Sequence, residues 1–278
     1  TGKKRGVALF RTTGPVPARS RWFLHDAADR RMDAARYSRL TFVERVDFSE
    51  ELAVFRLRAD TPVDFTPGQY ATLGLMNDDR DRPLLRPYSV ASAPGETELE
   101  FFIERVDDGA LTPKLWDLDR GADVWMRNKI VGRFTLDPDR THHLMAATVT
   151  GVGPYVSIIR DQLQKLRAGA LDTPDPMLVL HGASRSWELG TYLDELQALS
   201  DQVEWFEYVP TVSRPWEDPE WDGEYGRVED VLRKHLDATS FVPSDSAAYT
   251  CGHPKMIDKA QGILQRAGFE EDAIHAEK

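Results

Sequence analysis

An alternation of apolar runs and amphipathic stretches in the second half of the chain constrains its fold more than any other feature. The apolar runs span residues 143–149, 177–183, 203–212 and 247–252. The amphipathic stretches that follow them span residues 154–169, 187–200, 226–236 and 254–268. Nearly continuous apolar strands, each followed by a helix, are typical of a parallel sheet covered on both faces. We therefore predict an α/β domain over residues 140–278.

Residues 40–139 have a different pattern. Their segments are short, rich in β-branched and aromatic residues, and separated by turns such as TPG, APGE and DDG. This pattern predicts a small antiparallel β-barrel, with the stretch DPDRT at 137–141 as the joint to the next domain. A chain of 278 residues with 41% hydrophobic side chains is long enough to form two such cores.

Charge is distributed unevenly along the chain. The net charge is −11, yet residues 1–39 carry ten Lys or Arg against three Asp. We treat this segment as a basic extension that either lies against the acidic body of the protein or docks an acidic partner. Nucleic acid is the weakest candidate partner, because the acidic body would repel phosphates and no aromatic platform accompanies the arginines.

The chain has a single cysteine, Cys251. One thiol excludes a disulfide framework and a protein-ligated iron-sulfur cluster, and it fits a reducing compartment. We find no apolar run long enough to span a membrane and no signal-peptide core in the first residues. The expected protein is therefore cytoplasmic, with no membrane partner and no metal site.

Two glycines follow the first strand of the predicted parallel sheet, in the stretch TVTGVGPY at 148–155. Gly151 and Gly153 let the backbone approach a ligand closely, and Pro154 suits a first helical turn. Free N–H groups at such a turn can hold a pyrophosphate. A glycine pair at this place is equally compatible with plain turn chemistry, so by itself it leaves both interpretations open.

Three arginines, Arg185, Arg214 and Arg227, follow the ends of later strands. A single surface arginine is usually a solvated charge, but three at one rim beside a candidate pyrophosphate turn indicate a second phosphate group. This arrangement favours NADPH over NADH. Glu188 stands near enough to hold a free ribose hydroxyl instead.

The fourth parallel strand ends in TCGHPKM, residues 250–256. A small thiol, a glycine and a helix-starting proline predict a narrow, rigid slot for the edge of a flat ring. No general base for Cys251 is evident in the sequence, and His253 suits a helix start better than a catalytic pair. Cys251 is therefore expected to position a ligand and not to attack it.

Four ordered motifs resemble the ferredoxin-NADP reductase family, in its bacterial branch: RPYS at 86–89, DDGALTPKL at 107–115, TGVGPY at 150–155 and CGHPKM at 251–256. The resemblance covers roughly residues 40–270. It implies a flavin-binding β-barrel, residues 40–139, followed by an NADP-binding α/β domain, residues 140–278, with FAD held between them. The implied activity is hydride transfer from NADPH to FAD, followed by transfer of single electrons to a ferredoxin or flavodoxin.

The resemblance also implies roles for residues of the barrel. Arg86 would contact the FAD pyrophosphate, Tyr88 would lie along the isoalloxazine or the ribityl chain, and Ser89 would sit near the reactive N5 atom. Six further residues match the flavin-lining strand and the turn that grips the phosphates: Phe102, Ile103, Glu104, Gly109, Leu111 and Thr112. Phe102 and Leu111 could equally be hydrophobic core residues with no cofactor role, whereas Thr112, at a helix start, specifically indicates a phosphate contact.

In the second domain, the matches fall on the two glycine turns. They are Thr150, Gly151, Val152, Gly153, Pro154, Cys251, Gly252 and Pro254. Thr150 matches the threonine between flavin and nicotinamide. Ser89, Thr150 and Cys251 are the catalytic candidates, in the sense that they align two stacked rings.

The chain departs from the family pattern in three places. Val149 stands where the family usually has a glycine, so we expect the backbone there to avoid positive φ. Ser184 takes the place of the usual arginine, with Arg185 one residue later, so the 2′-phosphate assignment relies on Ser213, Arg214 and Arg227. At the end of the sequence, either Ile274 and His275 approach the ring or a final aromatic residue is missing from the sequence.

Two alternative functions stay open at this point. The same fold serves as the NADH-dependent reductase component of oxygenase systems, and a non-catalytic flavoprotein subunit could retain it without turnover. The choice of pyridine nucleotide separates the first alternative from the NADPH reductase, and a colourless purified protein would favour the second. The sequence predicts no oligomeric state.

Overall fold

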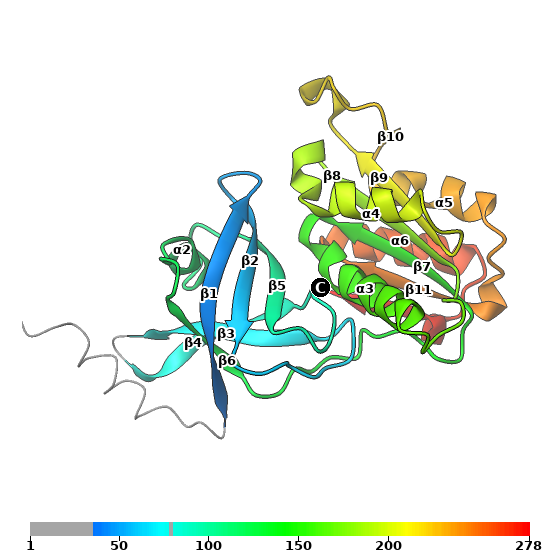
Figure 1. Ribbon diagram of the computed structural model, residues 1–278. Coiled ribbons are helices and arrows are strands. Elements are labelled where there is room, and N and C mark those ends of the chain that lie inside the picture. Colours follow the sequence, from blue (N-terminus) through cyan, green and yellow to red (C-terminus); the bar gives the residue numbers. More distant parts are fainter. Residues whose placement is uncertain (1–35, 78–79) are drawn as a thin grey trace, which may run out of the picture. The chain divides into compact units, whose positions relative to one another are not determined.

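The structure is a computed structural model that describes residues 36–77 and 80–278 (Figure 1). The N-terminal basic extension, residues 1–39, lies outside the described residues except for 36–39, and strand β1 already begins at Tyr37. Within the described ranges, we find no helix that is both long and apolar enough to cross a membrane.

The first domain is an antiparallel sheet with the strand order β4-β3-β6-β1-β2-β5. Its strands are β1 Tyr37–Asp47, β2 Leu52–Ala59, β3 Tyr70–Asn77, β4 Arg80–Ser89, β5 Glu98–Glu104 and β6 Asp123–Arg127, and a short helix, α2 Thr112–Trp116, follows β5. In β2, Phe55 and Leu57 point into the core, while Arg56 and Arg58 face Glu100 and Glu98 on β5 in register. This period-two pattern fixes the register, because a slip of one residue would bury the arginines.

The second domain is a parallel sheet with the strand order β10-β9-β8-β7-β11-β12. Its strands are β7 His142–Thr148, β8 Met177–Ala183, β9 Phe206–Val212, β10 Glu224–Tyr225, β11 Ser246–Cys251 and β12 Ile274–Glu277. The helices between them are α3 Gly153–Arg167, α4 Tyr192–Ser200, α5 Val228–Ala238 and α6 Pro254–Arg266. The predicted two-domain class, an antiparallel β-barrel and an α/β parallel sheet, is confirmed.

Each buried strand of this sheet contributes to two cores. In β7, Met145 and Ala147 pack with α3 and α4, whereas Leu144 and Ala146 pack with α5 and α6. Apolar residues at successive positions are needed because both faces of the sheet are covered. Strands β8 and β11 flank β7 on opposite sides, so the chain reverses direction across the sheet at the carboxyl end of β7. Ligands of open α/β sheets bind at such a switch point.

Strand β4 pairs with β3 up to the Tyr70–Ser89 position and ends there. One segment of the α/β domain differs from the sequence-based expectation. The helical stretch expected at 187–200 is broken at Gly190, whose φ of 67° lies in the left-handed region, and α4 begins only at Tyr192. A side chain at Gly190 would meet the Phe102 ring at 3.1 Å, so this residue also permits close packing against the barrel.

Candidate functional site

A cavity of about 810 Å³ lies at the carboxyl ends of β7 and β11. The barrel contributes Pro87, Tyr88, Ser89, Phe102 and Glu104 to its wall. The α/β domain contributes residues 148–151, 182–184, 213–214, 227–229, 251–256 and 277–278. Its volume falls in the range of pockets that hold cofactors and drug-sized ligands, roughly 300–1,000 Å³.

The β7–α3 turn, residues 149–152, contributes Val149, Thr150 and Gly151 to the wall of this cavity. It is a short 3₁₀ turn that leads directly into α3 at Gly153. Val149 has a φ of 46°, so the expectation that the valine would keep the backbone out of positive φ is wrong. Gly151 is required by close packing, since a Cβ there would lie 2.4 Å from the Cys251 carbonyl oxygen.

The β11–α6 turn, residues 252–253, is joined to the end of β7. The His253 N–H donates to Thr148 Oγ1 at 2.8 Å. Gly252 has a φ of 120°, and a Cβ there would lie 2.3 Å from Thr148 Oγ1. The two glycine turns therefore form one continuous wall, in which backbone groups replace side chains.

The thiol of Cys251 belongs to this wall but is poorly suited to nucleophilic attack. Burial raises its pKa far above the ordinary value, and the carboxylate of Glu277 raises it further. A protonated thiol is a weak nucleophile. Nucleophilic attack by Cys251 is therefore disfavoured, and its positioning role stays a prediction.

Ser89 marks the barrel side of the cavity. Its hydroxyl donates to Glu277 Oε1 at 2.9 Å, which links the end of β4 to β12. Burial raises the pKa of Glu277, and the hydrogen bond from Ser89 partly opposes this rise.

The end of the sequence enters the cavity through residues other than the expected ones. Ile274 packs beneath α6 and the His275 ring stacks on Tyr249, so neither side chain lines the cavity. Glu277 and Lys278 line it instead, because β12 pairs in parallel with β11 and sets Glu277 beside Cys251. Sequence reasoning missed Glu277, since this pairing leaves no local signal.

Tyr88 and Glu104 present polar groups at the same wall. The Tyr88 hydroxyl is buried and has no hydrogen-bond partner in the part of the chain that the structure describes. Burial raises the pKa of Tyr88 to about 12 and also raises the pKa of Glu104. Ile103, between the lining residues Phe102 and Glu104, points into the barrel core.

Other matched residues lie outside the cavity wall. The exposed guanidinium of Arg86 donates to the Leu85 carbonyl. Leu111 is buried in the barrel core, and Thr112 Oγ1 both accepts from the Val106 N–H and donates to the Val106 carbonyl. Gly109 lies in the same loop, where its N–H donates to Val106. Val152, Gly153 and Pro154 are buried at the start of α3, behind Gly151.

The three arginines separate into two groups. Arg214 and Arg227 line the cavity together with Ser213. Arg185 does not line it, because its guanidinium is paired with Glu217 and, at 2.9 Å, with Glu188. Glu188 is itself engaged, since its carboxylate also accepts from the Ser184 N–H at 2.8 Å. Two further cations at the cavity, Lys255 and Lys278, were not anticipated from the sequence.

Comparisons with known proteins agree with this architecture. Residues 145–262 match the oxidoreductase NAD-binding domain family. The chain is 33% identical to the flavodoxin/ferredoxin–NADP reductase of Escherichia coli strain K12 over 217 residues, 75% of this chain and 83% of that protein. It is 29% identical to the ferredoxin–NADP reductase of Pseudomonas aeruginosa over 249 residues, 82% of this chain and 91% of that protein.

A solved structure supports the same fold. The ferredoxin NADP⁺ reductase from Neisseria gonorrhoeae with bound FAD and NADP superposes with a TM-score of 0.73 at 22% identity, covering 87% of this chain and 98% of that one. At that identity the likeness concerns the fold alone. On the sequence match to the Escherichia coli enzyme, the chain belongs to the ferredoxin/flavodoxin–NADP reductase family.

Proposed function

We propose that the chain is an FAD-dependent oxidoreductase that transfers a hydride from NADPH to FAD and passes single electrons to a ferredoxin or flavodoxin. One observation carries the proposal. A single cavity is bordered by the end of β4, with Tyr88 and Ser89, and by both glycine turns of the parallel sheet. A flavin on the barrel side and a nicotinamide on the sheet side would meet there.

The residues present fit a flavin. The buried Tyr88 hydroxyl has an unmet hydrogen-bonding capacity among the described residues, which a polar group of the cofactor would satisfy. Arg86 is exposed and lies outside the cavity wall, where its guanidinium could contact the cofactor's phosphates.

The sheet side fits a phosphorylated dinucleotide. N–H groups of the β7–α3 turn lie at the start of α3, where backbone donors and the helix dipole favour an anion. Ser213, Arg214 and Arg227 supply a second anion site at the same cavity. Arg185 and Arg214 both pair with Glu217, Arg214 at 3.7 Å, but only Arg214 and Arg227 line the cavity, so we assign the 2′-phosphate to these two.

When bound, FAD supplies the hydride acceptor and the one-electron donor. The protein's own groups align and enclose the reactants. Thr150 and the Cys251–Gly252 backbone would shape the slot for the nicotinamide, and Ser89 lines the same cavity from the barrel. The hydrogen-bonded pair of Ser89 Oγ and Glu277 Oε1 can hold a proton at the cavity wall, because burial keeps the pKa of Glu277 above its ordinary value.

A spectroscopic experiment tests the proposal. The purified protein, reconstituted with FAD if necessary, is expected to show the visible absorption bands of oxidised flavin. Anaerobic NADPH should bleach these bands much faster than NADH at equal concentration. A protein that retains no flavin after reconstitution would overturn the proposal, and faster bleaching by NADH would favour the reductase component of an oxygenase system.

A further inference from the structure

Val149 occupies a backbone conformation that its own side chain disfavours. Its φ of 46° makes it the single non-glycine residue with positive φ among residues 36–77 and 80–278. β-Branched side chains rarely adopt this region, because Cβ and its two branches crowd the backbone. Surrounding structure must therefore hold the residue in place.

His181 on β8 makes the contact that can hold it. Its Nε2 atom lies 2.9 Å from the Val149 carbonyl oxygen, and its Nδ1 atom lies 3.0 Å from the Tyr208 hydroxyl. A carbonyl only accepts, so Nε2 carries the proton and donates to Val149. Tyr208 then donates to the unprotonated Nδ1, which fixes this tautomer.

The surroundings of His181 keep its ring neutral and enclosed. The side chain is fully buried, and Tyr208 is nearly so. Burial lowers the pKa of His181 to about 4, although the bond to Val149 opposes this fall. The neighbouring Gly182 packs against Val228, where a Cβ would meet a methyl group at 2.4 Å. The imidazole thus sits in a closely packed part of the sheet, next to the β7–α3 turn.

We infer that His181 is a positioning residue for nucleotide binding: its hydrogen bond holds Val149 in the left-handed conformation and so presents Thr150 and Gly151 to the cavity. The inference rests on the proposed function of this site. His181 does not line the cavity, whereas Val149, Thr150 and Gly151 do, so it acts through the turn. Tyr208 supports it by fixing the tautomer.

A double-mutant cycle with His181→Ala and Val149→Gly tests the inference. The readout is the dissociation constant of NADP⁺, measured by calorimetry on the flavin-loaded protein. His181→Ala should raise this constant about tenfold, the effect of losing one buried hydrogen bond. Glycine adopts positive φ without strain, so Val149→Gly supplies a background without a strained side chain, and its own dissociation constant is the reference for the second comparison. In the Val149→Gly background, His181→Ala should cost less than about threefold, because no strained side chain remains to be held.

His143 provides a matched control. It is also a buried histidine in the parallel sheet, bonded to a tyrosine hydroxyl, that of Tyr249, but it lies near the opposite end of β7 from the turn. His143→Ala should lower the thermal stability and leave the NADP⁺ dissociation constant unchanged. If His181→Ala does not fold, Tyr208→Phe with and without Val149→Gly carries the same comparison, with an expected rise of about threefold that glycine relieves.

The possible outcomes separate this inference from the proposed function. An unaltered protein that binds no NADP⁺ contradicts the proposed function itself. If the unaltered protein binds NADP⁺, the proposed function stands. The positioning role of His181 is then wrong in two cases: His181→Ala, or Tyr208→Phe in its place, does not weaken NADP⁺ binding, or it weakens binding by the same factor with valine and with glycine at position 149.

Discussion

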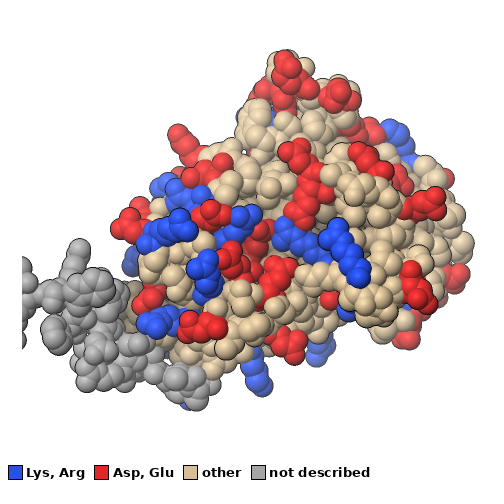
Figure 2. All heavy atoms as spheres, in the orientation of Figure 1, with Lys and Arg blue, Asp and Glu red and all other residues tan. Residues whose placement is uncertain are grey.

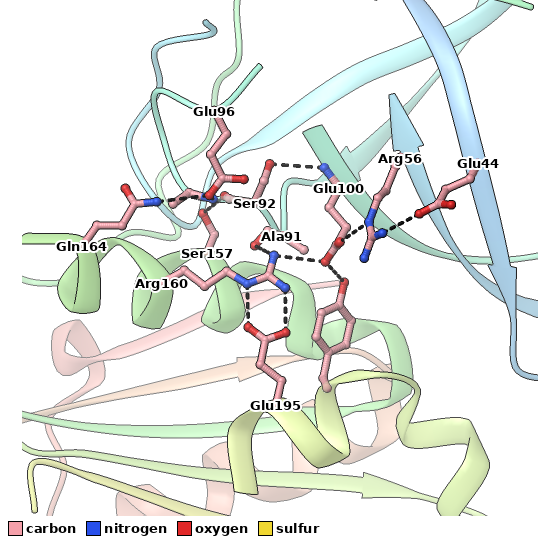
Figure 3. Close-up of polar contacts among 12 residues, drawn as sticks. Glu44, Arg56, Ala91, Ser92, Glu96, Glu100, Ser157, Arg160, Gln164 and Glu195 are labelled. Atoms are coloured by element: carbon pink, nitrogen blue, oxygen red, sulfur yellow. Dashed lines mark hydrogen bonds and ion pairs between the residues drawn. The ribbon is translucent and has the colours of Figure 1, made fainter. Parts of the chain in front are cut away.

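Arg160 Nη1 lies 3.0 Å from Glu100 Oε1, and this ion pair joins the helix that begins at the β7–α3 turn to a strand of the barrel (Figure 3). Arg160 also pairs with Glu195 on α4 at 2.7 Å and donates to the Ala91 carbonyl. One turn earlier on α3, Ser157 Oγ donates to the Ser92 carbonyl at 2.8 Å. The segment that follows Ser89 is therefore fixed directly to the nucleotide-binding domain.

Glu100 is buried, and its carboxylate accepts from three side chains, those of Arg56, Arg160 and Tyr192. Burial alone would raise its pKa, but the two guanidinium groups and the Tyr192 hydroxyl hold the pKa below its ordinary value. Glu100 therefore stays charged at neutral pH. A buried charge of this kind is costly once a partner is removed.

Arg160→Met should consequently destabilise the protein by about 3–5 kcal/mol, because the buried charge of Glu100 then loses one of its two guanidinium partners. The matched control is Arg58→Met. Arg58 on β2 pairs with Glu98 on β5, the strand that also carries Glu100, but this pair is exposed, and its loss should cost under about 1 kcal/mol. Acidic and basic side chains are mixed over the face shown in Figure 2. Urea denaturation of the flavin-loaded proteins measures both values. Equal effects of the two substitutions would contradict the role given to the buried pair.

Much of the fold could be predicted because its signals are local. The apolar residues Leu144, Met145, Ala146 and Ala147 each find a covered face, so a continuous apolar run was enough to predict a two-sided parallel sheet. The cavity likewise contains Ser89, Thr150 and Cys251, each of which stands at or just beyond a strand end.

The features that could not be predicted depend on contacts between distant residues. The φ of Val149 contradicts the preference of valine, and its surroundings, including His181 on another strand, override that preference. Glu277 reaches the cavity through a pairing with β11 that no local pattern signals. Arg185 follows the end of a strand, as Arg214 and Arg227 do, yet its guanidinium pairs with Glu188 and Glu217 and does not line the cavity.

The choice between the two nucleotides should depend on Arg214 and Arg227. Each charge-assisted contact to a 2′-phosphate is worth roughly 1.5–3 kcal/mol, so Arg214→Ala or Arg227→Ala should raise the KM for NADPH about tenfold to a hundredfold. The KM for NADH, which lacks this phosphate, should change little. Steady-state reduction of ferricyanide with each nucleotide measures both.

Arg185→Ala is the control for this experiment, because Arg185 is paired with Glu188 and Glu217 and does not line the cavity. Its KM for NADPH should stay within about threefold of the unaltered protein. A large NADPH-specific loss in Arg185→Ala, without one in Arg214→Ala, would transfer the 2′-phosphate site to Arg185.

The titration of Glu277, hydrogen-bonded to Ser89, should produce a limb in the pH dependence of the rate of flavin reduction by NADPH. Burial raises the pKa of Glu277 and the bond from Ser89 lowers it, so Ser89→Ala should move this limb to higher pH. Glu277→Gln keeps the shape of the side chain without its titration, so the limb should disappear. Stopped-flow reduction by NADPH across a pH series gives the profile, and an unchanged limb in Glu277→Gln would assign it to another group.

The two buried histidines should make the protein sensitive to mild acid. Burial lowers the pKa values of His143 and His181 to about 4 in the folded state, whereas an unfolded histidine titrates near its ordinary value of about 6.5. Between these values the unfolded chain binds more protons, so stability falls as the pH drops from about 6.5 towards 4. Each histidine contributes on the order of 3 kcal/mol to this loss.

His143→Gln separates this effect from acid sensitivity in general. Glutamine retains a polar side chain beside Tyr249 but does not titrate, so the fall in the free energy of unfolding between pH 7 and pH 5 should be about 2 kcal/mol smaller than in the unaltered protein. At pH 7 the variant is expected to be less stable, because the buried imidazole packs closely. Urea denaturation at both pH values measures the difference, and an identical pH slope in the two proteins would show that His143 takes up its proton equally in both states.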